Sequence, residues 1–347
     1  MRICFFLPAP TDAISGGTVY DRRMIAALAA AGHEVHPIGL AGRHPFPDQA
    51  AEAAARAAFA AMAEDTLAVI DGMCLPAFAP IADAFALRRV VGLIHHPTAL
   101  ERGESAAARE ALRAIERHLY GMLPRIIVTS AETARQLGAD FAVAGDRIRT
   151  VEPGTAPAPR SPGSGGPDCA LLALGMLIAR KGHDVLLHAL ARLPDLDWRL
   201  TIAGSDAREP THAGELRALA AELGITGRVH FAGELRDAAL EDAWRGADIF
   251  ALAPWWEGYG MAIAEALKRG VPLAITGGGA AGALVPPEAG VVAPPGDVAT
   301  LSKGLRRMIF DVDLRRTMAQ AAFTAGTRLP SWESQCSRFL AALDGTA

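Results

Sequence analysis

Apolar runs and helical patterns alternate from the first residues of the chain. The run 2–7 has no polar alternation, which is typical of a strand buried on both faces of a parallel sheet. A glycine loop at 15–18 follows, then a helical pattern over 19–31 that ends at Gly32, a residue suited to the position after a helix. A second strand is expected over 34–40. This order predicts a right-handed βαβ unit with parallel strands.

The same alternation extends through most of the chain and predicts an α/β fold built on parallel sheets. The apolar runs expected as strands are 67–70, 89–94, 126–129, 170–174, 198–203, 229–231, 249–253 and 272–275. The segments expected as helices, rich in alanine or apolar at helical spacing, are 48–64, 104–121, 183–192, 213–223, 237–245 and 261–269. The last part, 301–343, is expected to be helical with a break at Leu329-Pro330.

A stretch rich in proline, glycine and serine divides the chain. Residues 153–167 read PGTAPAPRSPGSGGP, a composition that sustains neither helix nor sheet. We therefore expect an N-terminal Rossmann-like domain over 1–156, a flexible linker over 157–166 and a C-terminal Rossmann-like domain over 167–328. Ligands of open parallel sheets bind beyond the carboxyl ends of the strands, so two such domains facing each other predict a site in a central cleft.

Composition narrows the class of protein. Hydrophobic residues make up 51% and charged residues 21% of the 347 residues, which is typical of a globular protein. The formal net charge of −4 argues against a protein that coats nucleic acid, so no nucleic-acid partner is predicted. Four widely spaced cysteines form no CxxC pair, so neither a zinc site nor a disulfide framework is predicted.

The hydrophobic pattern also bears on location. No window holds the 18 consecutive apolar residues of a membrane helix, and Pro8 and Pro10 interrupt the first apolar run too early for a signal-peptide core. We expect a soluble, cytoplasmic protein. A stripe of arginines on the helix expected over 104–121 is of the kind that lies against anionic lipid: Arg109, Arg113 and Arg117. Glutamates interleave with this stripe and favour an ordinary solvated face over peripheral membrane contact: Glu104, Glu110 and Glu116.

The most informative segment is 255–272, which reads WWEGYGMAIAEALKRGVP. Glu257 lies in a glycine-rich turn before a helix, and Glu265 lies about two turns inside it. Gly258 and Gly260 allow the backbone to approach a ligand closely, and the helix N-terminus suits a phosphate. The two carboxylates are then suited to accept hydrogen bonds from the hydroxyl groups of a sugar and of a ribose. The alternative is that Glu257 interacts with the helix dipole and Glu265 is merely solvated.

Two adjacent cations follow the first strand of the second half. Arg180 and Lys181 lie at its carboxyl end, where they suit a diphosphate whose negative charge grows as its bond to a sugar breaks. A basic pair in a turn is often only solvated. The chain has three lysines, Lys181, Lys268 and Lys303, so composition alone is a weak explanation for a lysine here.

The first half carries weaker signals. Gly16-Gly17 follow the first strand and predict a loop at the site, although tight turns use the same pair. His95-His96 lie at the end of a strand, where one imidazole suits a substrate hydroxyl or carbonyl; a buried core histidine is the alternative. Glu101 is a candidate acceptor contact or simply a charge at a helix start. The loop 276–282, rich in glycine, is expected either to add to a phosphate cradle or to be mobile.

Together these segments resemble the retaining glycosyltransferases of family 4, which have the GT-B fold, along nearly the whole chain. The family's Glu-x7-Glu pattern is matched by Glu257 and Glu265. Its other motifs are matched by Gly175 with Lys181-Gly182, by Gly16-Gly17 and by Pro153-Gly154. The phosphate-binding arginine that usually follows the first of these glycines is Met176 here, so either Arg180 substitutes for it or the diphosphate is held more weakly. The acidic residue that usually follows the family's late Gly-Gly loop is absent, with Gly282 nearby.

The resemblance implies a fold of two Rossmann-like domains and a nucleoside diphosphate sugar as donor. Glu265 would hold the ribose, Glu257 the sugar hydroxyls, and Lys181 with Arg180 the leaving diphosphate. The remaining implied donor contacts are Gly16, Gly17, Gly175, Gly258, Tyr259 and Gly260. His95 or His96 would touch the donor sugar or the acceptor.

The resemblance also implies a reaction that retains anomeric configuration and needs neither a metal nor a cofactor. The acceptor would be a saccharide, a lipid-linked molecule or a small molecule. The C-terminal helix, expected within 329–347, would cross back to the N-terminal domain. The alternatives are a non-catalytic nucleotide-sugar binder of the same fold and an NDP-sugar epimerase.

Overall fold

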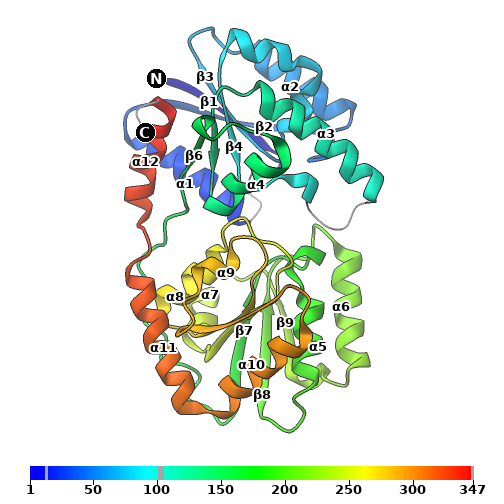
Figure 1. Ribbon diagram of the computed structural model, residues 1–347, viewed down its shortest axis with the longest axis vertical. Helices are drawn as coiled ribbons and strands as arrows, with labels where there is room; N and C mark the ends of the chain where they lie inside the picture. The colour runs from blue at the N-terminus through cyan, green and yellow to red at the C-terminus, as the bar shows by residue number, and fades with distance from the viewer. Residues whose placement is uncertain (12–14, 101–104, 345–347) are drawn as a thin grey trace. The chain divides into compact units, whose positions relative to one another are not determined.

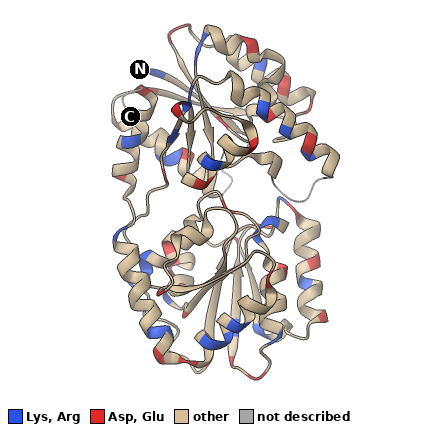
Figure 2. Cartoon of the chain, in the orientation of Figure 1, with Lys and Arg blue, Asp and Glu red and all other residues tan. Residues whose placement is uncertain are grey.

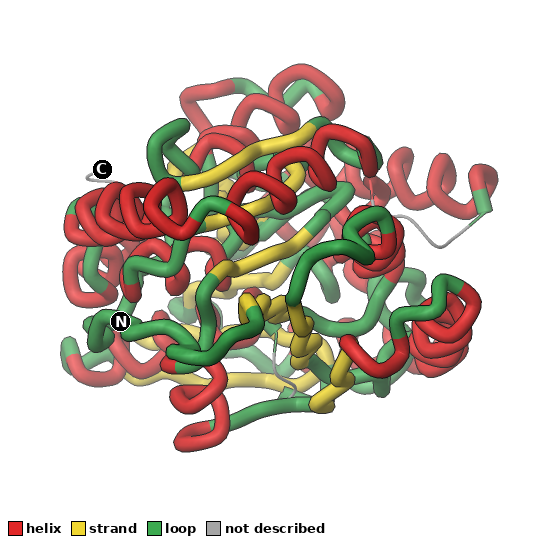
Figure 3. The backbone as a smooth tube through the Cα atoms, turned by 90° about the horizontal axis from the view of Figure 1, so that it is seen from below, coloured by secondary structure: helices red, strands yellow, loops and turns green. Residues whose placement is uncertain are grey.

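The chain folds into two compact units. The structure, a computed structural model, describes residues 1–11, 15–100 and 105–344. The first unit comprises Met1–Gly154 and Trp332–Ala347, and the second unit comprises Thr155–Ser331. Within the described residues each unit contains one six-stranded sheet, and every strand pair is parallel. Helices flank the strands in both units (Figure 1, Figure 3).

The first unit orders its strands β2-β1-β3-β4-β5-β6. The strands are β1 (Arg2–Pro8), β2 (Glu34–Leu40), β3 (Leu67–Asp71), β4 (Arg89–Ile94), β5 (Ile126–Val128) and β6 (Ile148–Thr150). The α-helices are α1 (Gly16–Ala30), α2 (Gln49–Ala60), α3 (Ala106–Met122), α4 (Ala131–Phe141) and α12 (Trp332–Asp344). Short 3₁₀ segments are η1 (Leu75–Leu87), η2 (Thr98–Leu100) and η3 (Gly145–Arg147).

Alternate strand residues build two cores in this unit, because successive side chains of a strand point to opposite faces. Phe5 packs with Tyr20 and Met24 of α1, whereas its neighbour Phe6 packs on the other face with Phe59 of α2. The long apolar runs seen in the sequence are therefore strands covered on both faces.

The C-terminal helix α12 belongs to the first unit and lies against α1 (Figure 1). The ring of Phe339 stands edge-on to Tyr20, with centroids 6.2 Å apart. Arg125 donates hydrogen bonds to the carbonyls of Ala342 and Leu343 at 2.8 and 3.2 Å. Buried apolar area and satisfied helix-end carbonyls together stabilise this packing.

The second unit orders its strands β12-β11-β10-β7-β8-β9. The strands are β7 (Cys169–Leu174), β8 (Trp198–Ala203), β9 (Val229–Gly233), β10 (Ile249–Leu252), β11 (Leu273–Thr276) and β12 (Gly290–Ala293). The helices are α5 (His183–Ala191), α6 (Pro210–Glu222), α7 (Asp237–Arg245), α8 (Met261–Arg269), α9 (Ala281–Leu284), α10 (Val298–Phe310) and α11 (Val312–Thr327), with 3₁₀ turns η4 (Ala179–Lys181) and η5 (Thr226–Arg228).

Each strand order reverses direction at one point, and these points locate the candidate sites. In the first unit the reversal lies between β1 and β3, and in the second between β7 and β10. Loops that leave neighbouring strands in opposite directions open a crevice at the carboxyl edge of such a sheet, where ligands bind. The residues that follow these strands are therefore the ones that can form a site within each unit.

Three sequence expectations differ from the structure. Gly16 and Gly17 do not form a loop but are the first residues of α1, because Ser15 caps the helix by accepting a hydrogen bond from the Thr18 amide. The segment 157–166 is not a free linker: it lies in the second unit, where Ser161 donates to backbone carbonyls of α7. Several elements were also not predicted, namely η1, α4, β6, α9 and β12.

The helix α3, which carries the arginine stripe, also differs from expectation. Arginines and glutamates alternate along it (Figure 2). Glu116, expected to be solvated, is buried instead, whereas Arg117 is exposed. Among the described residues, no helix combines the length and apolar character required to cross a membrane.

Candidate active site

In the second unit, the loops that follow β7 and β10 bring two cations to one carboxylate. Lys181 Nζ lies 2.5 Å from Glu257 Oε1. Arg180 Nη1 lies 3.6 Å from Glu257 Oε2 and donates to the Trp256 carbonyl at 2.8 Å. The side chains of Lys181, Glu257 and Arg180 are 14%, 9% and 11% exposed, respectively. The group therefore holds a net positive charge that is largely shielded from water.

Glycines make this close approach possible. A Cβ on Gly175 would lie 3.1 Å from Cε of Lys181, so the lysine side chain lies directly over this position. Gly182 has a φ of +63°, and a Cβ there would lie 1.8 Å from the Ala253 carbonyl oxygen. The backbones of the two loops thus touch, and the Trp255 amide donates to the Arg180 carbonyl at 2.9 Å. Their contact fixes the place of Arg180 and Lys181 relative to Glu257.

The glycine loop after β11 supports the turn that carries Glu257. The Glu257 amide donates to the Gly278 carbonyl at 3.1 Å, and its own carbonyl accepts from the Ala280 amide at 2.9 Å. A Cβ on Gly278 would lie 2.3 Å from the Trp255 carbonyl oxygen. The loop is therefore packed backbone to backbone against the site, and the Ala280 amide already donates its hydrogen bond within the protein.

This packing leads to a first prediction. Gly278→Ala will lower the stability of the second unit by about 1–3 kcal/mol, since the methyl group overlaps backbone and a whole turn must move. Gly227→Ala is the matched control, because a Cβ there meets nothing within 4 Å. Calorimetric unfolding of both variants tests this; equal melting temperatures would contradict the described packing.

The helix α8 begins beside the same carboxylate. Gly260 precedes it with a φ of +102°, which favours glycine, while Tyr259 is buried and Gly258 half-buried. The first amides of a helix have no intrahelical partner and suit a phosphate. Glu265 lies inside α8, where burial raises its pKa and Arg269 opposes the shift. The roles of these four residues stay predictions.

A buried histidine holds the loop after β7. His183 opens α5, and its Nε2 donates to the Met176 carbonyl at 3.3 Å. Burial lowers the pKa of His183 to about 4, so the ring is neutral at physiological pH. The backbone of Met176, the position that departs from the resembled family, is thus held by His183.

In the first unit, Gly17 lies against the ring of His95. A Cβ on Gly17 would lie 3.2 Å from His95 Cδ2. His95 follows β4 directly, and its carbonyl accepts hydrogen bonds from Thr129 and Thr133 at 3.1 and 3.3 Å. The structure therefore brings together two of the sequence-predicted residues, the second glycine and the first histidine.

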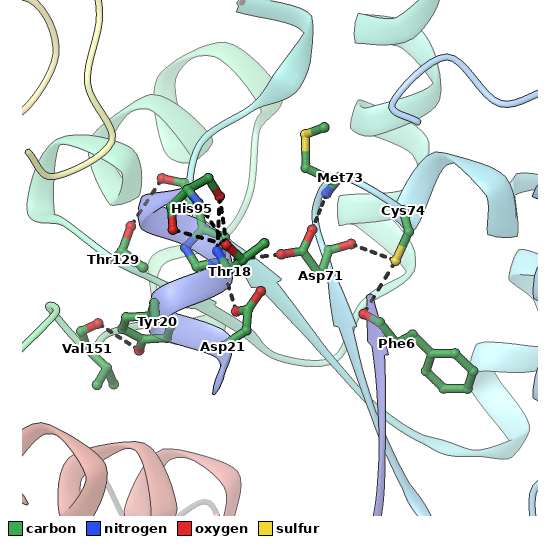
Figure 4. A network of polar contacts seen from close by, with 11 residues as sticks. Phe6, Thr18, Tyr20, Asp21, Asp71, Met73, Cys74, His95, Thr129 and Val151 are labelled. Carbon is green, nitrogen blue, oxygen red and sulfur yellow. Dashed lines mark hydrogen bonds and ion pairs between the residues drawn. The ribbon is translucent and has the colours of Figure 1, made fainter. Parts of the chain in front are cut away.

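Two buried aspartates lie beside the His95 ring and contact the same ring nitrogen (Figure 4). Nε2 lies 3.0 Å from Asp21 Oδ1 of α1 and 3.3 Å from Asp71 Oδ2 at the end of β3. Burial alone would lower the pKa of His95, but the two carboxylates outweigh it and raise the pKa to about 10. Burial raises the pKa of Asp21 to about 7, although His95 opposes this shift. The imidazole is therefore held as a cation.

Among the described residues, Asp21, Asp71 and His95 also form a group of the kind that can hold a metal ion, since one ligand atom of each lies within 4.8 Å of the others. Nε2, however, lies at hydrogen-bond and ion-pair distances from both carboxylates. A protonated imidazole satisfies these contacts, so we treat the group as an ion-pair network.

A pH dependence follows from the raised pKa of His95. Its usual value is 6.5 and its value in the folded chain is about 10, so folding favours the protonated ring. This stabilisation is complete below about pH 6.5 and is lost as the pH rises towards 10. We expect the melting temperature of the first unit to fall over that range, and His95→Gln to remove most of the fall. A parent protein whose melting temperature is constant from pH 7 to 10 would contradict this.

The turn after His95 rests on Glu116. This carboxylate accepts from the Thr98 amide at 2.7 Å, the Thr98 hydroxyl at 2.6 Å and the Ala99 amide at 3.2 Å. Burial raises the pKa of Glu116, while the Thr98 and Ala99 hydrogen bonds oppose the shift. His96 is half-buried in this turn. Glu101 lies outside the described residues.

Removing this acceptor will destabilise the first unit. Glu116→Ala leaves buried donors of η2 without a partner, and we expect a loss of about 3 kcal/mol. Glu110→Ala is the control, because Glu110 is exposed on the same helix. Urea unfolding of both variants measures the difference, and equal midpoints would show that the η2 turn does not depend on Glu116.

The sequence reading missed Asp21, Asp71 and Glu116. Asp71 carried a signal, since it ends the apolar run 67–70 at the carboxyl edge of the sheet. Asp21 and Glu116 lie on helices, where an acidic residue among apolar ones looks like part of a solvated face. Only their partners, which are distant in sequence, show that they are buried.

Comparisons with known proteins agree with this architecture. Residues 159–324 match the family described as glycosyl transferases group 1. The chain is 27% identical to an MMP alpha-(1->4)-mannosyltransferase of Mycolicibacterium hassiacum, over 73% of this chain and 64% of that protein. It is 29% identical to a D-inositol 3-phosphate glycosyltransferase of Corynebacterium efficiens, over 63% of this chain and 56% of that protein. The alignments thus span less than two thirds of these relatives' lengths.

Solved structures share the fold of the whole chain. Sucrose-phosphate synthase from Thermosynechococcus elongatus superposes with a TM-score of 0.83 at 20% identity, covering 100% of both chains. Anabaena Alr3699/HepE in complex with UDP and glucose gives a TM-score of 0.76 at 17% identity, covering 99% of this chain and 100% of that one.

The fold is therefore the GT-B fold of glycosyltransferases, with two Rossmann-like α/β units. Residues 159–324 are similar to the glycosyl transferases of group 1, and the relatives named above are glycosyltransferases.

Proposed function

We propose that the protein is a retaining glycosyltransferase of family 4 that transfers a sugar from a nucleoside diphosphate sugar to an acceptor hydroxyl. The observation that carries this proposal is the group formed by Arg180, Lys181 and Glu257 at the strand reversal of the second unit. The structure of Anabaena Alr3699/HepE in complex with UDP and glucose supports a nucleotide-sugar donor.

The charges of this group fit a departing diphosphate. Lys181 and Arg180 form ion pairs with a single carboxylate and are largely shielded from water, so an anion that reaches them meets pre-positioned cations. Charge develops on the diphosphate only as its bond to the sugar breaks, so these cations stabilise the transition state more than the bound donor. With cations in this role, we propose that no metal ion or cofactor is needed.

Glu257 binds the donor sugar in this proposal, because a carboxylate accepts hydrogen bonds from hydroxyl groups. Glu265 binds the ribose, and Gly175, Gly258, Tyr259 and Gly260 line the donor position. In the first unit, Gly16, Gly17, His95 and His96 are the proposed substrate contacts, and Glu101 stays a candidate for the acceptor.

The reaction we propose needs no protein base. The acceptor oxygen bonds to the anomeric carbon on the face from which the diphosphate leaves, so configuration is retained. The bond between that carbon and the phosphate oxygen breaks, and the leaving phosphate oxygen takes the acceptor proton. One relative is named a D-inositol 3-phosphate glycosyltransferase, which makes small, phosphorylated polyols the first acceptors to examine.

The test is turnover with a panel of UDP, GDP, ADP and TDP sugars, each offered with sugar and inositol phosphates. Release of nucleoside diphosphate that depends on the acceptor is expected, with the anomeric configuration of the product read by NMR. A product of inverted configuration would refute retention, and no turnover across a complete panel would refute the activity.

Met176 favours a second candidate, a nucleotide-sugar binder without transfer activity. It predicts saturable binding of a nucleoside diphosphate without transfer or hydrolysis. Activity gained in Met176→Arg but absent in the parent would support this second function.

A further inference from the structure

The network around His95 suggests a role that the proposed function leaves open. A histidine that contacts a substrate can act as a base, when neutral, or as a charged hydrogen-bond donor. The two possibilities differ in the protonation of the ring nitrogen that faces the substrate. They also differ in the groups that contact the second ring nitrogen.

The described contacts settle which nitrogen is used within the protein. Nε2 is shared by Asp21 at 3.0 Å and Asp71 at 3.3 Å, and both aspartates are buried, at 1% and 2% exposed. Asp71 is itself fixed, because its Oδ1 accepts from the Met73 amide at 2.6 Å. The His95 side chain is 16% exposed, and among the residues that the structure describes no hydrogen-bond partner is recorded for Nδ1.

The other described residues around the imidazole ring hold it in place and carry no charge that would change its protonation. Tyr20 stands edge-on to the imidazole at 5.3 Å between centroids and donates its hydroxyl to the Val151 carbonyl. Burial raises the pKa values of both Tyr20 and the neighbouring Cys74 well above their usual range, so both are neutral. Among the residues that the structure describes, the carboxylates that face His95 are those of Asp21 and Asp71.

We propose that Asp21 and Asp71 are positioning residues that hold His95 as an imidazolium and leave its Nδ1–H as a charged hydrogen-bond donor for an oxygen of the substrate. His95 does not remove the acceptor proton, because both nitrogens carry protons in this state. A charged donor contributes roughly twice the strength of a neutral one. The proposal rests on the proposed function only in naming a sugar substrate as the partner of Nδ1.

The charge state is tested without turnover. In the full chain with ¹⁵N-labelled histidine, the His95 ring signals, assigned by their contacts to Tyr20 and their loss in His95→Gln, are followed from pH 5 to 10. We expect both ring nitrogens to stay protonated up to pH 8. A His95 that titrates near pH 6.5, its usual value, would overturn the proposal.

The positioning role is tested with Asp21→Asn and Asp71→Asn, which keep side-chain shape. Each should lower the titration midpoint of His95 by at least one pH unit, with the larger shift for Asp21, the closer carboxylate. Glu64→Gln, which removes an exposed carboxylate from the same unit, is the control and should leave it unchanged. An unchanged midpoint in both aspartate variants would overturn the assignment.

Two further readouts separate this inference from its alternatives. If the transferase activity is found, the alkaline limb of kcat/KM should move to lower pH in Asp21→Asn, which a purely structural role would not cause. If no activity is found, the NMR titration still decides the charge of His95. Selective loss of the His95 signals on adding Mn²⁺ would overturn the proposal, because Nε2 would then bind metal instead of donating to Asp21.

Discussion

Lys181→Ala will lower kcat/KM for sugar transfer by about 10²–10³-fold, the usual effect of removing one pre-positioned group that stabilises transition-state charge. The reason is the place of the ammonium group: it lies at the carboxyl end of β7, is 14% exposed, and has Glu257 at 2.5 Å. The variant should also bind a nucleoside diphosphate more weakly. Steady-state kinetics and calorimetric titration measure the two effects.

The chain offers a matched control for this variant. Lys303 is exposed on α10 in the same unit, and Lys303→Ala should keep full activity. Lys181→Arg should retain part of the activity, because it keeps the charge but not the geometry of an ammonium group. Thermal unfolding of each variant separates a loss of the site from a loss of the fold. A folded Lys181→Ala that turns over as fast as the parent would refute the assignment.

Glu257→Gln will also reduce transfer, by about 10–100-fold, since a hydrogen bond to a charged group contributes about 1.5–3 kcal/mol. Its effect on nucleoside diphosphate binding should have the opposite sign to that of Lys181→Ala. The carboxylate is the anionic partner of Lys181 and Arg180, so its loss removes a negative charge beside them and raises the positive charge that a diphosphate meets. Binding of the diphosphate alone should therefore become stronger.

This pair of opposite effects distinguishes a sugar-binding role from a merely structural one. Glu288→Gln is the control, because Glu288 is exposed in the same unit. If Glu257→Gln bound nucleoside diphosphate much more weakly while remaining folded, Glu257 would have to contact the nucleotide, and the proposed division of roles would be wrong.

The α/β fold could be predicted from the sequence because the buried parallel strands are short runs in which apolar residues predominate. Arg89–Ile94 and Trp198–Ala203, for example, have the predicted bounds. The elements that were missed lack such patterns. The segment Leu75–Leu87 is apolar except for Asp83 and contains Pro76 and Pro80, so it shows no helical period. The strand Ile148–Thr150 is too short to give a recognisable hydrophobic pattern.

The closeness of Lys181 and Glu257 in the second unit could be predicted from the sequence because of the sheet topology. Residues that follow strands of a parallel sheet meet at one edge, so Lys181 and Glu257 could be expected near each other. The ion pairs themselves, and the backbone contact that Gly278 permits, depend on packing between loops.

The first unit shows where such reasoning fails. Asp21 sits inside a helix and Asp71 at a strand end, 50 residues apart in number, and nothing in their spacing connects them to His95. Gly17 likewise looked like part of a loop, because a helix that begins with two glycines is intrinsically unfavourable. The cap from Ser15 and the closeness of the His95 ring explain why glycine is nevertheless there.

The most direct test is a crystal structure of the full chain with the nucleoside diphosphate that most raises its melting temperature. The account predicts diphosphate oxygens within hydrogen-bond distance of Lys181 Nζ and of the Arg180 guanidinium, with the nucleotide on the carboxyl edge of the second unit's sheet. A nucleotide bound elsewhere, with Lys181 still bonded only within the protein, would contradict it.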